Sequence, residues 1–319
     1  MRWLQLLLAQ HASWLTAASI VIATVALVPA FANPSYWAAL SQQFFPAAVL
    51  ALALTPIILT GGIDLSIGSV TVFCSVVVGA LWHDLGWPIG WAIVGGILAG
   101  LAVGLFNGVL VTVGIWPLVA TLATRELFRG LAQTLSGDNP VTRFPPALRE
   151  FWRTRWLGLP PSLWTFALLL VLTYLVVHHT WLGRMIFALG DNEEAARFAG
   201  LPVRRVKLSL YAWSGLMAGV CGAAIVMRYG AAKADAEKSL ELTAIACVVL
   251  GGVRITGGSG HVAGTLLGIV TIVVLLAGLN YATSTWRETL TGTLLIAVAV
   301  ANEAGQRWAE QRSALEKAN

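Results

Sequence analysis

Two glycine-rich stretches interrupt the apolar parts of the sequence, and each carries one charged residue at the same position. The stretch Gly61–Ser69 (GGIDLSIGS) returns as Gly251–Ser259 (GGVRITGGS), so that Asp64 aligns with Arg254. Clustered glycines with a serine could cradle a phosphate, but a P-loop needs a lysine after its last glycine, and neither stretch has one. The repeat, with its charge inverted, therefore predicts a structural role rather than a phosphate site. It indicates two helix hairpins that are broken at glycines.

The composition places these stretches in a membrane protein. Hydrophobic residues make up 57% of the 319 residues and charged residues 11%, where a soluble domain has about 45 to 50% and about 25%. Long, nearly continuous apolar runs favour helices over a barrel, whose strands would alternate apolar and polar residues. The net charge of +5 needs no nucleic acid partner, because positively charged inner loops explain it.

The two charged residues of the repeat, Asp64 and Arg254, could form an ion pair. Charges inside a bilayer are costly and usually face a cavity or a partner. We therefore expect Asp64 and Arg254 to pair, or to belong to one network that braces the two hairpins. The alternative is that each residue separately caps a turn near the lipid headgroups. The residues that define the repeated motif are Gly61, Gly62, Asp64, Ser66, Gly68, Gly251, Gly252, Arg254 and Gly258.

The elements that must hold this motif are membrane-spanning helices. A span needs about 20 predominantly apolar residues, and the sequence predicts ten spans within a single domain, residues 1–319. They are Leu15–Ala32, Phe44–Thr60, Ile67–Leu81, Ile89–Val111, Trp116–Leu135, Leu163–Val177, Leu208–Tyr229, Leu242–Val253, His261–Tyr281 and Trp286–Ala301. The first is interpreted as a retained span rather than a signal peptide. The predicted fold is an all-α polytopic membrane protein with an internal repeat of glycine-broken hairpins.

An even number of spans puts both termini on one side, with residues 302–319 as a solvated tail. If this side is the inner one, Lys and Arg in the inner segments outnumber those in the outer segments by ten to seven. That is a weak majority for the positive-inside rule. The four arginines of the predicted outer loop Ser136–Pro161 argue against it.

The long predicted inner loop, residues 180–207, contains a candidate docking helix. Acidic residues from Asp191 open a short stretch of good helix formers that ends at Gly200, and Pro202 follows. Acidic residues in a first turn and a glycine stop are typical of a helix. Such a helix between two spans is either a rigid element that another protein grips or an amphipathic helix that lies on the bilayer.

This loop resembles a known signature. Glu194-Ala195-Ala196 with Gly200 is similar to the EAA-x3-G signature of ABC importer permeases, in which the loop forms the coupling helix that docks into the ATPase. Residues 182–200 and Thr60–Ser69 look like the monosaccharide permeases of the ribose, arabinose and rhamnose group, which includes the autoinducer-2 importer. The resemblance extends from about Phe44 to Ala301. Further similar stretches are Pro117–Leu122, Arg129–Leu131, Gly158–Pro160 and Leu250–Gly260.

The resemblance implies a bacterial inner-membrane permease with both termini cytoplasmic. It implies ABC ATPase subunits, a second permease copy or a paralogue, and a periplasmic solute-binding protein that meets the outer loops Ser136–Pro161 and Gly230–Glu241. ATP and Mg would lie on the partner ATPase, so this chain itself would bind no cofactor. The residues expected to couple the permease to the ATPase are Asn192, Glu193, Glu194, Ala195, Ala196, Arg197 and Gly200.

The adjacent charges Arg125 and Glu126 depart from the family's usual apolar or small residues. Glu126 lies three residues before Arg129, so a local Glu126–Arg129 contact is one interpretation. The other is a polar patch on the translocation path. Sugars need hydroxyl partners and flat apolar faces rather than charge, so amides and hydroxyls are the better candidates. The possible pathway residues are Asn107, Thr121, Arg125 and Arg129.

The sequence lacks the residue patterns that ATP hydrolysis, metal binding and nucleophilic catalysis need. No P-loop, HExxH motif, paired-cysteine zinc spacing or nucleophile elbow occurs, and Cys74, Cys221 and Cys247 are isolated within apolar runs. We therefore expect no metal site and no ATPase in this chain. An ion-coupled secondary transporter, which also uses broken helices, is the alternative function. It would need a titratable group at the middle of the membrane. A polytopic membrane enzyme is a more distant alternative.

Overall fold

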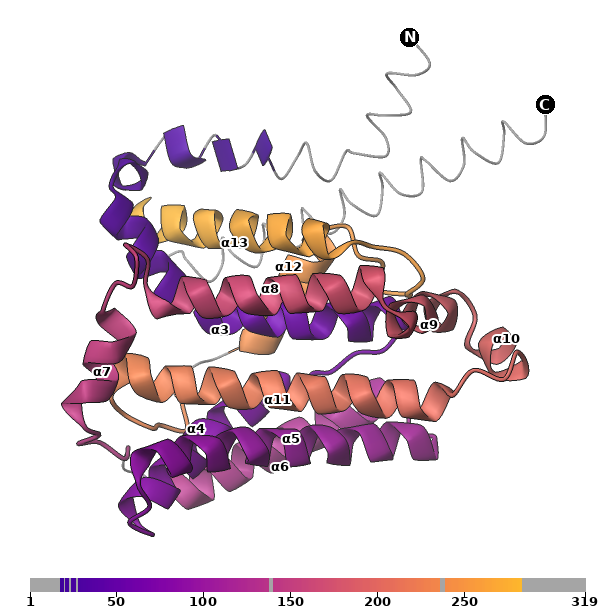
Figure 1. Cartoon of the computed structure of the whole chain (residues 1–319), viewed down its shortest axis with the longest axis horizontal. Helices are drawn as coiled ribbons and strands as arrows, with labels where there is room; N and C mark the ends of the chain where they lie inside the picture. The colour runs from indigo at the N-terminus through magenta and orange to yellow at the C-terminus, as the bar shows by residue number, and fades with distance from the viewer. Residues whose placement is uncertain are drawn as a thin grey trace.

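The computed structural model describes residues 18–19, 21–22, 24–26, 28–137, 140–235 and 239–282 (Figure 1). Each predicted span between Phe44 and Tyr281 falls on a helix in this part. The predicted first span is described only in part. The predicted tenth span, Trp286–Ala301, and the predicted tail, residues 302–319, lie outside the described residues, so the position of both termini stays a prediction.

Helices make up the regular structure of the described part, and strand pairing is limited to two isolated bridges, Val141–Ala232 and Trp156–Leu159. The elements are η1 (Pro29–Ala32), α3 (Pro34–Leu59), α4 (Ile67–His83), α5 (Ile89–Val113), α6 (Pro117–Ser136), α7 (Pro146–Arg153), α8 (Pro161–His179), α9 (Trp181–Asp191), α10 (Glu193–Phe198), α11 (Val203–Tyr229), α12 (Leu240–Leu250) and α13 (Val262–Ala282).

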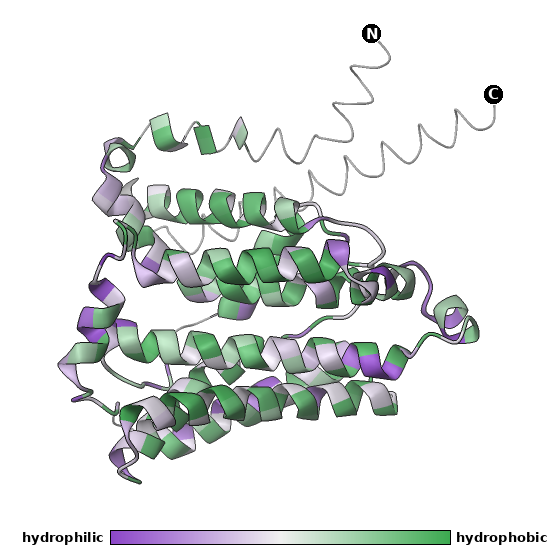
Figure 2. Cartoon of the chain, in the orientation of Figure 1, coloured by the Kyte–Doolittle hydropathy of each residue, from purple (hydrophilic) through white to green (hydrophobic). Residues whose placement is uncertain are grey.

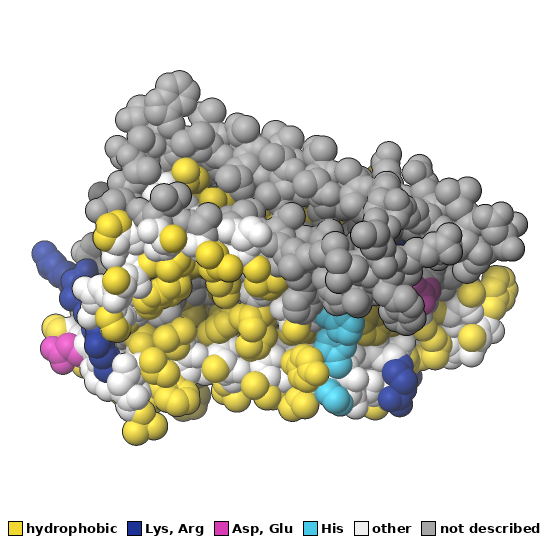
Figure 3. All heavy atoms as spheres, turned by 90° about the horizontal axis from the view of Figure 1, so that it is seen from above, with side chains coloured by type: hydrophobic (Ala, Val, Ile, Leu, Met, Phe, Trp, Pro, Cys, Tyr) yellow, Lys and Arg dark blue, Asp and Glu magenta, His cyan; other side chains and the backbone are white. Residues whose placement is uncertain are grey.

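Five of the described helices, α3, α5, α8, α11 and α13, are long and apolar enough to cross a membrane. They run side by side, with α7 at one end of the bundle and α10 at the other (Figure 1). Hydrophilic residues gather at these two ends (Figure 2). In the described part of the face seen from above, a broad apolar patch lies between basic side chains on one side and histidine and basic side chains on the other (Figure 3). This banding is what a bilayer requires of a multi-pass protein.

Helix α3 lies at the centre of the core, and almost every residue from Phe44 to Leu59 is buried. It begins ten residues earlier than the sequence predicts, at Pro34 rather than Phe44. The reason is local: the side chain of Asn33 accepts a hydrogen bond from the Ser35 amide, and proline is favoured in the first turn of a helix.

Helices α5 and α11 pack through their backbones. A side chain at Gly104 of α5 would collide with the carbonyl oxygen of Tyr211 and would lie 2.9 Å from the Gly215 Cα atom on α11. Gly100 approaches Gly215 and Gly219 in the same way. Small residues four apart allow this close approach in membranes, where apolar burial alone does not drive helices together.

Helices α4 and α12 are shorter than the five long apolar helices, and the described residues before them lie at opposite ends of the bundle. Residues 60–66 lead into α4 from Leu59, which packs against Gly190 near α10. Residues 231–235 follow α11 at the α7 end, where Arg149 donates a hydrogen bond to the Tyr229 carbonyl, and α12 begins at Leu240. Helix α12 has 11 residues, about 16 Å, which is about half of a bilayer core. The two predicted glycine-rich breaks are present as non-helical segments, residues 60–66 before α4 and residues 251–261 after α12.

We predict that Gly104→Ala destabilises the chain by about 1 to 3 kcal/mol, because the added methyl group overpacks the α5–α11 contact. Gly130→Ala in α6 is the matched control, since nothing lies within 4 Å of its Cβ position. Removing a helical glycine there should be neutral or stabilising by up to about 1 kcal/mol. Thermal unfolding of the purified chain in detergent measures both. Equal effects of the two substitutions would contradict the packing described for α5 and α11.

Candidate functional site

The two glycine-rich stretches meet each other in space. The Gly258 amide donates a hydrogen bond of 3.0 Å to the carbonyl of Leu59. Gly61, at φ +73°, has its Cβ position 3.1 Å from the Thr256 carbonyl oxygen. Gly190 of α9 packs on the same backbone, against Leu59 and Gly258. The repeat therefore forms one junction at the α10 end, to which α9 is also fixed.

The predicted Asp64–Arg254 pair is wrong. Asp64 is only 2% exposed, and its Oδ1 accepts hydrogen bonds from the Ser66 amide at 3.0 Å and the Ser66 hydroxyl at 2.6 Å. Its Oδ2 accepts from the Ser214 hydroxyl of α11 at 2.7 Å. Arg254 lies in the loop after α12, where its amide donates to the Ser259 carbonyl at 3.0 Å. Three hydroxyl and amide donors thus replace the expected cation.

Asp64 instead joins the start of α4 to α5 and α11. Asn107 of α5 donates from Nδ2 to the Ser66 hydroxyl at 2.8 Å, and the Tyr211 hydroxyl of α11 donates to the Ile63 carbonyl at 3.1 Å. These bonds satisfy the polar groups of a non-helical segment that is buried among apolar helices. That is the condition for irregular backbone at membrane depth.

The starts of α4 and α12 also meet. The Cβ position of Gly68, in the first turn of α4, lies 3.2 Å from the Glu241 amide and against the Glu241 carboxylate. Glu241 is the second residue of α12 and is 4% exposed. Its carboxylate therefore lies beside the positive N-terminal ends of two helices, which stabilise a negative charge.

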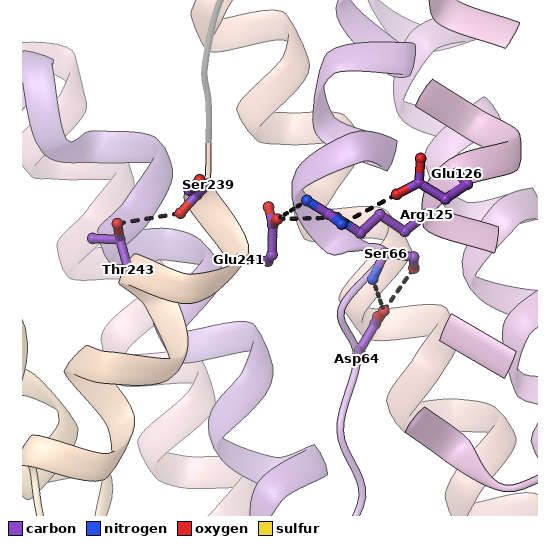
Figure 4. A network of polar contacts seen from close by, with 7 residues as sticks. All are labelled: Asp64, Ser66, Arg125, Glu126, Ser239, Glu241 and Thr243. Carbon is purple, nitrogen blue, oxygen red and sulfur yellow. Dashed lines mark hydrogen bonds and ion pairs between the residues drawn. The ribbon is translucent and has the colours of Figure 1, made fainter. Parts of the chain in front are cut away.

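Arg125 neutralises this carboxylate from α6 (Figure 4). Its Nε and Nη2 atoms both lie 3.1 Å from Glu241 Oε1. Its Nη1 atom lies 3.1 Å from Glu126 Oε1. The expected Glu126–Arg129 contact is wrong, because Arg125 takes Glu126 and Arg129 makes no ion pair in the described part of the chain. We call Arg125, Glu126, Arg129 and Glu241 the Arg125 cluster.

The Arg125 cluster borders a small polar hollow. Arg129, Glu241, Ser239 and Asp235 line it together with Gly68, and its volume is about 20 Å³, which is room for about one water molecule. Arg125 is near the middle of α6. The 67% exposed side chain of Glu126 projects from the same region of α6, although a charged group facing lipid is costly. An aqueous or protein surface must therefore lie beside it in the membrane.

The two other predicted pathway residues lie in the packed interior. Asn107 is 1% exposed and binds Ser66, and the buried Thr121 hydroxyl donates to the Pro117 carbonyl of its own helix. In this conformation they line no open path. Arg125 and Arg129 are the predicted residues that the structure places beside a hollow.

Glu241 was missed as a site residue because the sequence places it at the end of a polar outer loop. The structure puts it inside α12 instead. Its signal was present in the sequence: an acidic residue directly before an apolar run that is too short to span a bilayer.

The predicted inner loop is largely helical. Met185, Ile186 and Leu189 bury one face of α9, so this amphipathic helix packs on the bundle. Asn192 then caps α10 by accepting a hydrogen bond from the Ala195 amide at 2.9 Å. The predicted helix from Asp191 is thus divided, since α9 ends at Asp191 and α10 begins at Glu193.

Helix α10 is held at its base and exposed at its tip. Glu193 pairs with Arg197 at 3.1 Å and with Lys207 of α11 at 2.7 Å. Gly200, at φ +80°, ends the segment with a left-handed residue. Glu194 and Ala195 are exposed, and Phe198 is 91% exposed. Phe198 was not among the predicted coupling residues, and its only signal in the sequence is a bulky apolar residue inside a polar segment.

Comparison with known proteins identifies the class of protein to which this arrangement belongs. A family described as branched-chain amino acid transport system / permease component matches residues 36–299. The ribose import permease protein of Bacillus subtilis is 38% identical over 285 residues, 88% of each chain. The autoinducer 2 import system permease protein of Photorhabdus laumondii is 35% identical over 291 residues, 85% of this chain and 87% of its own. No solved structure matches the chain.

The chain belongs to this family of transport-system permease components. It is a multi-pass protein of the inner membrane, as its family and its apolar helices show. The comparisons support the ABC importer reading of the sequence and not the ion-coupled alternative.

We predict that Arg125 and Glu241 are coupled energetically. Arg125→Gln should destabilise the chain by about 3 to 5 kcal/mol, because it leaves the buried Glu241 carboxylate without its cation. The double variant Arg125→Gln with Glu241→Gln should be less destabilised than the sum of the single variants, with a coupling energy of at least about 1 kcal/mol.

Thermal unfolding of the four proteins in detergent measures this coupling. Glu126→Gln is the matched control, since it removes the exposed partner of the same arginine and should change stability by less than about 1 kcal/mol. Strict additivity of the two buried substitutions would contradict the pairing.

Proposed function

We propose that this chain is the transmembrane permease subunit of an ABC importer for a monosaccharide or a similar polyol-like solute. The relatives include a ribose import permease and autoinducer 2 import permeases. The observation that carries the proposal is the continuous connection from the exposed α10 helix through the glycine junction to the Arg125 cluster. It links a docking surface for an ATPase to a polar site within the membrane.

Helix α10 is the part of the chain that fits a cleft in an ATPase. The Glu194 carboxylate and the Phe198 ring are both exposed at its tip, so one partner surface could take a charge and an apolar group from the same turn. Lys207 binds Glu193 at 2.7 Å, which couples any displacement of α10 to α11. In this proposal the α10 end is cytoplasmic and the α7 end faces the periplasm.

The glycine junction provides a route for the movement. Gly190 of α9 contacts the backbone of Leu59 and Gly258 with no side chain between them. Contacts between backbones transmit displacement with little slack, since packed interiors have few voids. Residues 60–66 continue from this junction to α4, whose first turn contacts Glu241. A shift of α9 would therefore reach the Arg125 cluster through α4.

The Arg125 cluster is the proposed polar lining of the translocation path. Guanidinium and carboxylate groups bind vicinal hydroxyls without needing a charged solute, because they supply several donors and acceptors at fixed spacing. The hollow of about 20 Å³ is too small for a sugar. The path is therefore closed here and opens when the elements around the cluster separate. A second permease copy, or a paralogue, would supply the opposite wall beside Glu126.

The remaining subunits follow from the same proposal. This chain carries no ATPase of its own, and separate ABC ATPase subunits hold ATP and Mg and drive the cycle. A periplasmic solute-binding protein delivers the solute at the α7 end. The permease breaks no bond in the solute.

We predict that Glu194→Lys and Phe198→Ala each lower co-purification of the partner ATPase and ATP-driven uptake by at least about tenfold, a loss of about 1.4 kcal/mol or more of binding free energy. The matched controls for ATPase co-purification are Glu150→Lys and Phe151→Ala on α7, exposed residues of the same types at the opposite end. Pull-down of the ATPase and uptake into cells measure both. Normal assembly and uptake with both α10 variants would remove α10 from the docking surface.

The transport function itself is tested by reconstitution. The permease, its ATPase and its solute-binding protein in liposomes should accumulate a radiolabelled sugar, such as ribose, only with ATP present. A panel of pentoses, hexoses and linear polyols then defines the solute. Accumulation that persists without ATP and follows an imposed ion gradient would instead establish the ion-coupled alternative.

A further inference from the structure

An apolar groove lies between α3, α8 and α13, away from the Arg125 cluster. Its volume is about 220 Å³, and its walls include Phe44 and Ala48 of α3, Phe166 of α8, and Leu266 and Val270 of α13. Two hydroxyls reach it, those of Ser41 and Ser162, and they lie 3.1 Å apart in a hydrogen bond with each other. The groove therefore offers a polar solute no free partner and suits a hydrocarbon chain.

The groove has the length of one bilayer leaflet. It extends along α3 from Trp37 to Ala48, twelve residues whose Cα atoms span about 16 Å of helix. The hydrocarbon core of a bilayer is about 30 Å thick, so one leaflet is about 15 Å. Trp37 lies at the end near α7, and its indole nitrogen donates to the Phe31 carbonyl at 2.8 Å. Tryptophans favour this depth, where the ring is apolar and the N–H still finds a polar partner.

A basic hollow continues the groove at the α7 end. This second hollow has a volume of about 320 Å³ and shares Trp37 and Leu163 with the groove. Arg155 and Gly158 line it. The guanidinium group of Arg155 donates to the Ser35 hydroxyl at 3.2 Å and has no carboxylate partner among the residues that the structure describes. Its other N–H groups are available to an anion.

From these features we propose that the chain binds an anionic glycerophospholipid, with one acyl chain in the α3–α8–α13 groove and the phosphate on Arg155. The positive charge of Arg155 favours an anionic headgroup, and the apolar groove, about as long as one leaflet, favours an acyl chain. The proposal also gives a role to one of the arginines of the Ser136–Pro161 segment. It is independent of which side of the membrane the α7 end faces.

Photo-cross-linking tests where the lipid lies. The full-length chain is reconstituted with phosphatidylglycerol that carries a diazirine in one acyl chain, and the labelled peptides are identified by mass spectrometry. We expect labels on the groove residues Phe166, Leu266 and Val270. Labels confined to the outward face of α8, at the exposed Leu168 and Val171, would show ordinary annular lipid and overturn the proposal.

Variants test the two halves of the site separately. In native mass spectrometry, Arg155→Gln should weaken retention of phosphatidylglycerol about threefold to tenfold, as expected for one lost charge-assisted contact. Arg153→Gln is the matched control, an exposed arginine of the same segment that lines neither hollow. Val270→Trp, which fills the open edge of the groove, should abolish the groove labels.

Thermal unfolding confirms that each variant is folded, and the surface variant Arg155→Gln keeps the test valid if Val270→Trp does not fold. Equal phosphatidylglycerol retention in Arg155→Gln and Arg153→Gln would overturn the headgroup assignment. Unchanged groove labels in a folded Val270→Trp would overturn the chain assignment.

Discussion

Two helices begin inside the membrane-spanning part of this protein, and the free amide groups at their first turns need partners there. Water is scarce at this depth, so an unsatisfied backbone group would cost several kcal/mol. Asp64 supplies acceptors just before α4, and Glu241 places a carboxylate between the starts of α4 and α12. The rest of the site follows from placing two carboxylates in an apolar core.

The two carboxylates are stabilised by different means. Asp64 is surrounded by neutral donors from Ser66 and Ser214, which fix residues 60–66 against α11. Glu241 has a cation instead, and Arg125 connects it to an exposed carboxylate at Glu126. The first arrangement is fully buried and braces the fold. The second reaches the surface of α6 through Glu126, where the proposed function places the solute.

Glycines allow the elements around these two carboxylates to pack backbone to backbone. At the junction of Leu59, Gly190 and Gly258 the backbones are in contact, and the same is true of α5 and α11 at Gly104 and Gly215. Side chains at these positions would push the elements apart. The elements around the site are therefore packed backbone to backbone, and α9 connects the exposed α10 helix directly to this junction.

The sequence by itself determined the helical membrane class, the positions of the helices between Phe44 and Tyr281, the repeated glycine breaks and the short helix at Glu194, because hydrophobic runs, glycines and capping residues act locally. Only the tertiary structure decided that Asp64 binds Ser214 instead of Arg254, that Arg125 joins Glu241 across 116 residues, and that the α3–α8–α13 groove meets a hollow lined by Arg155. These contacts depend on the relative positions of helices far apart in the chain. Residue spacing carries no information about those positions, since a buried charge accepts any partner that packing brings within reach.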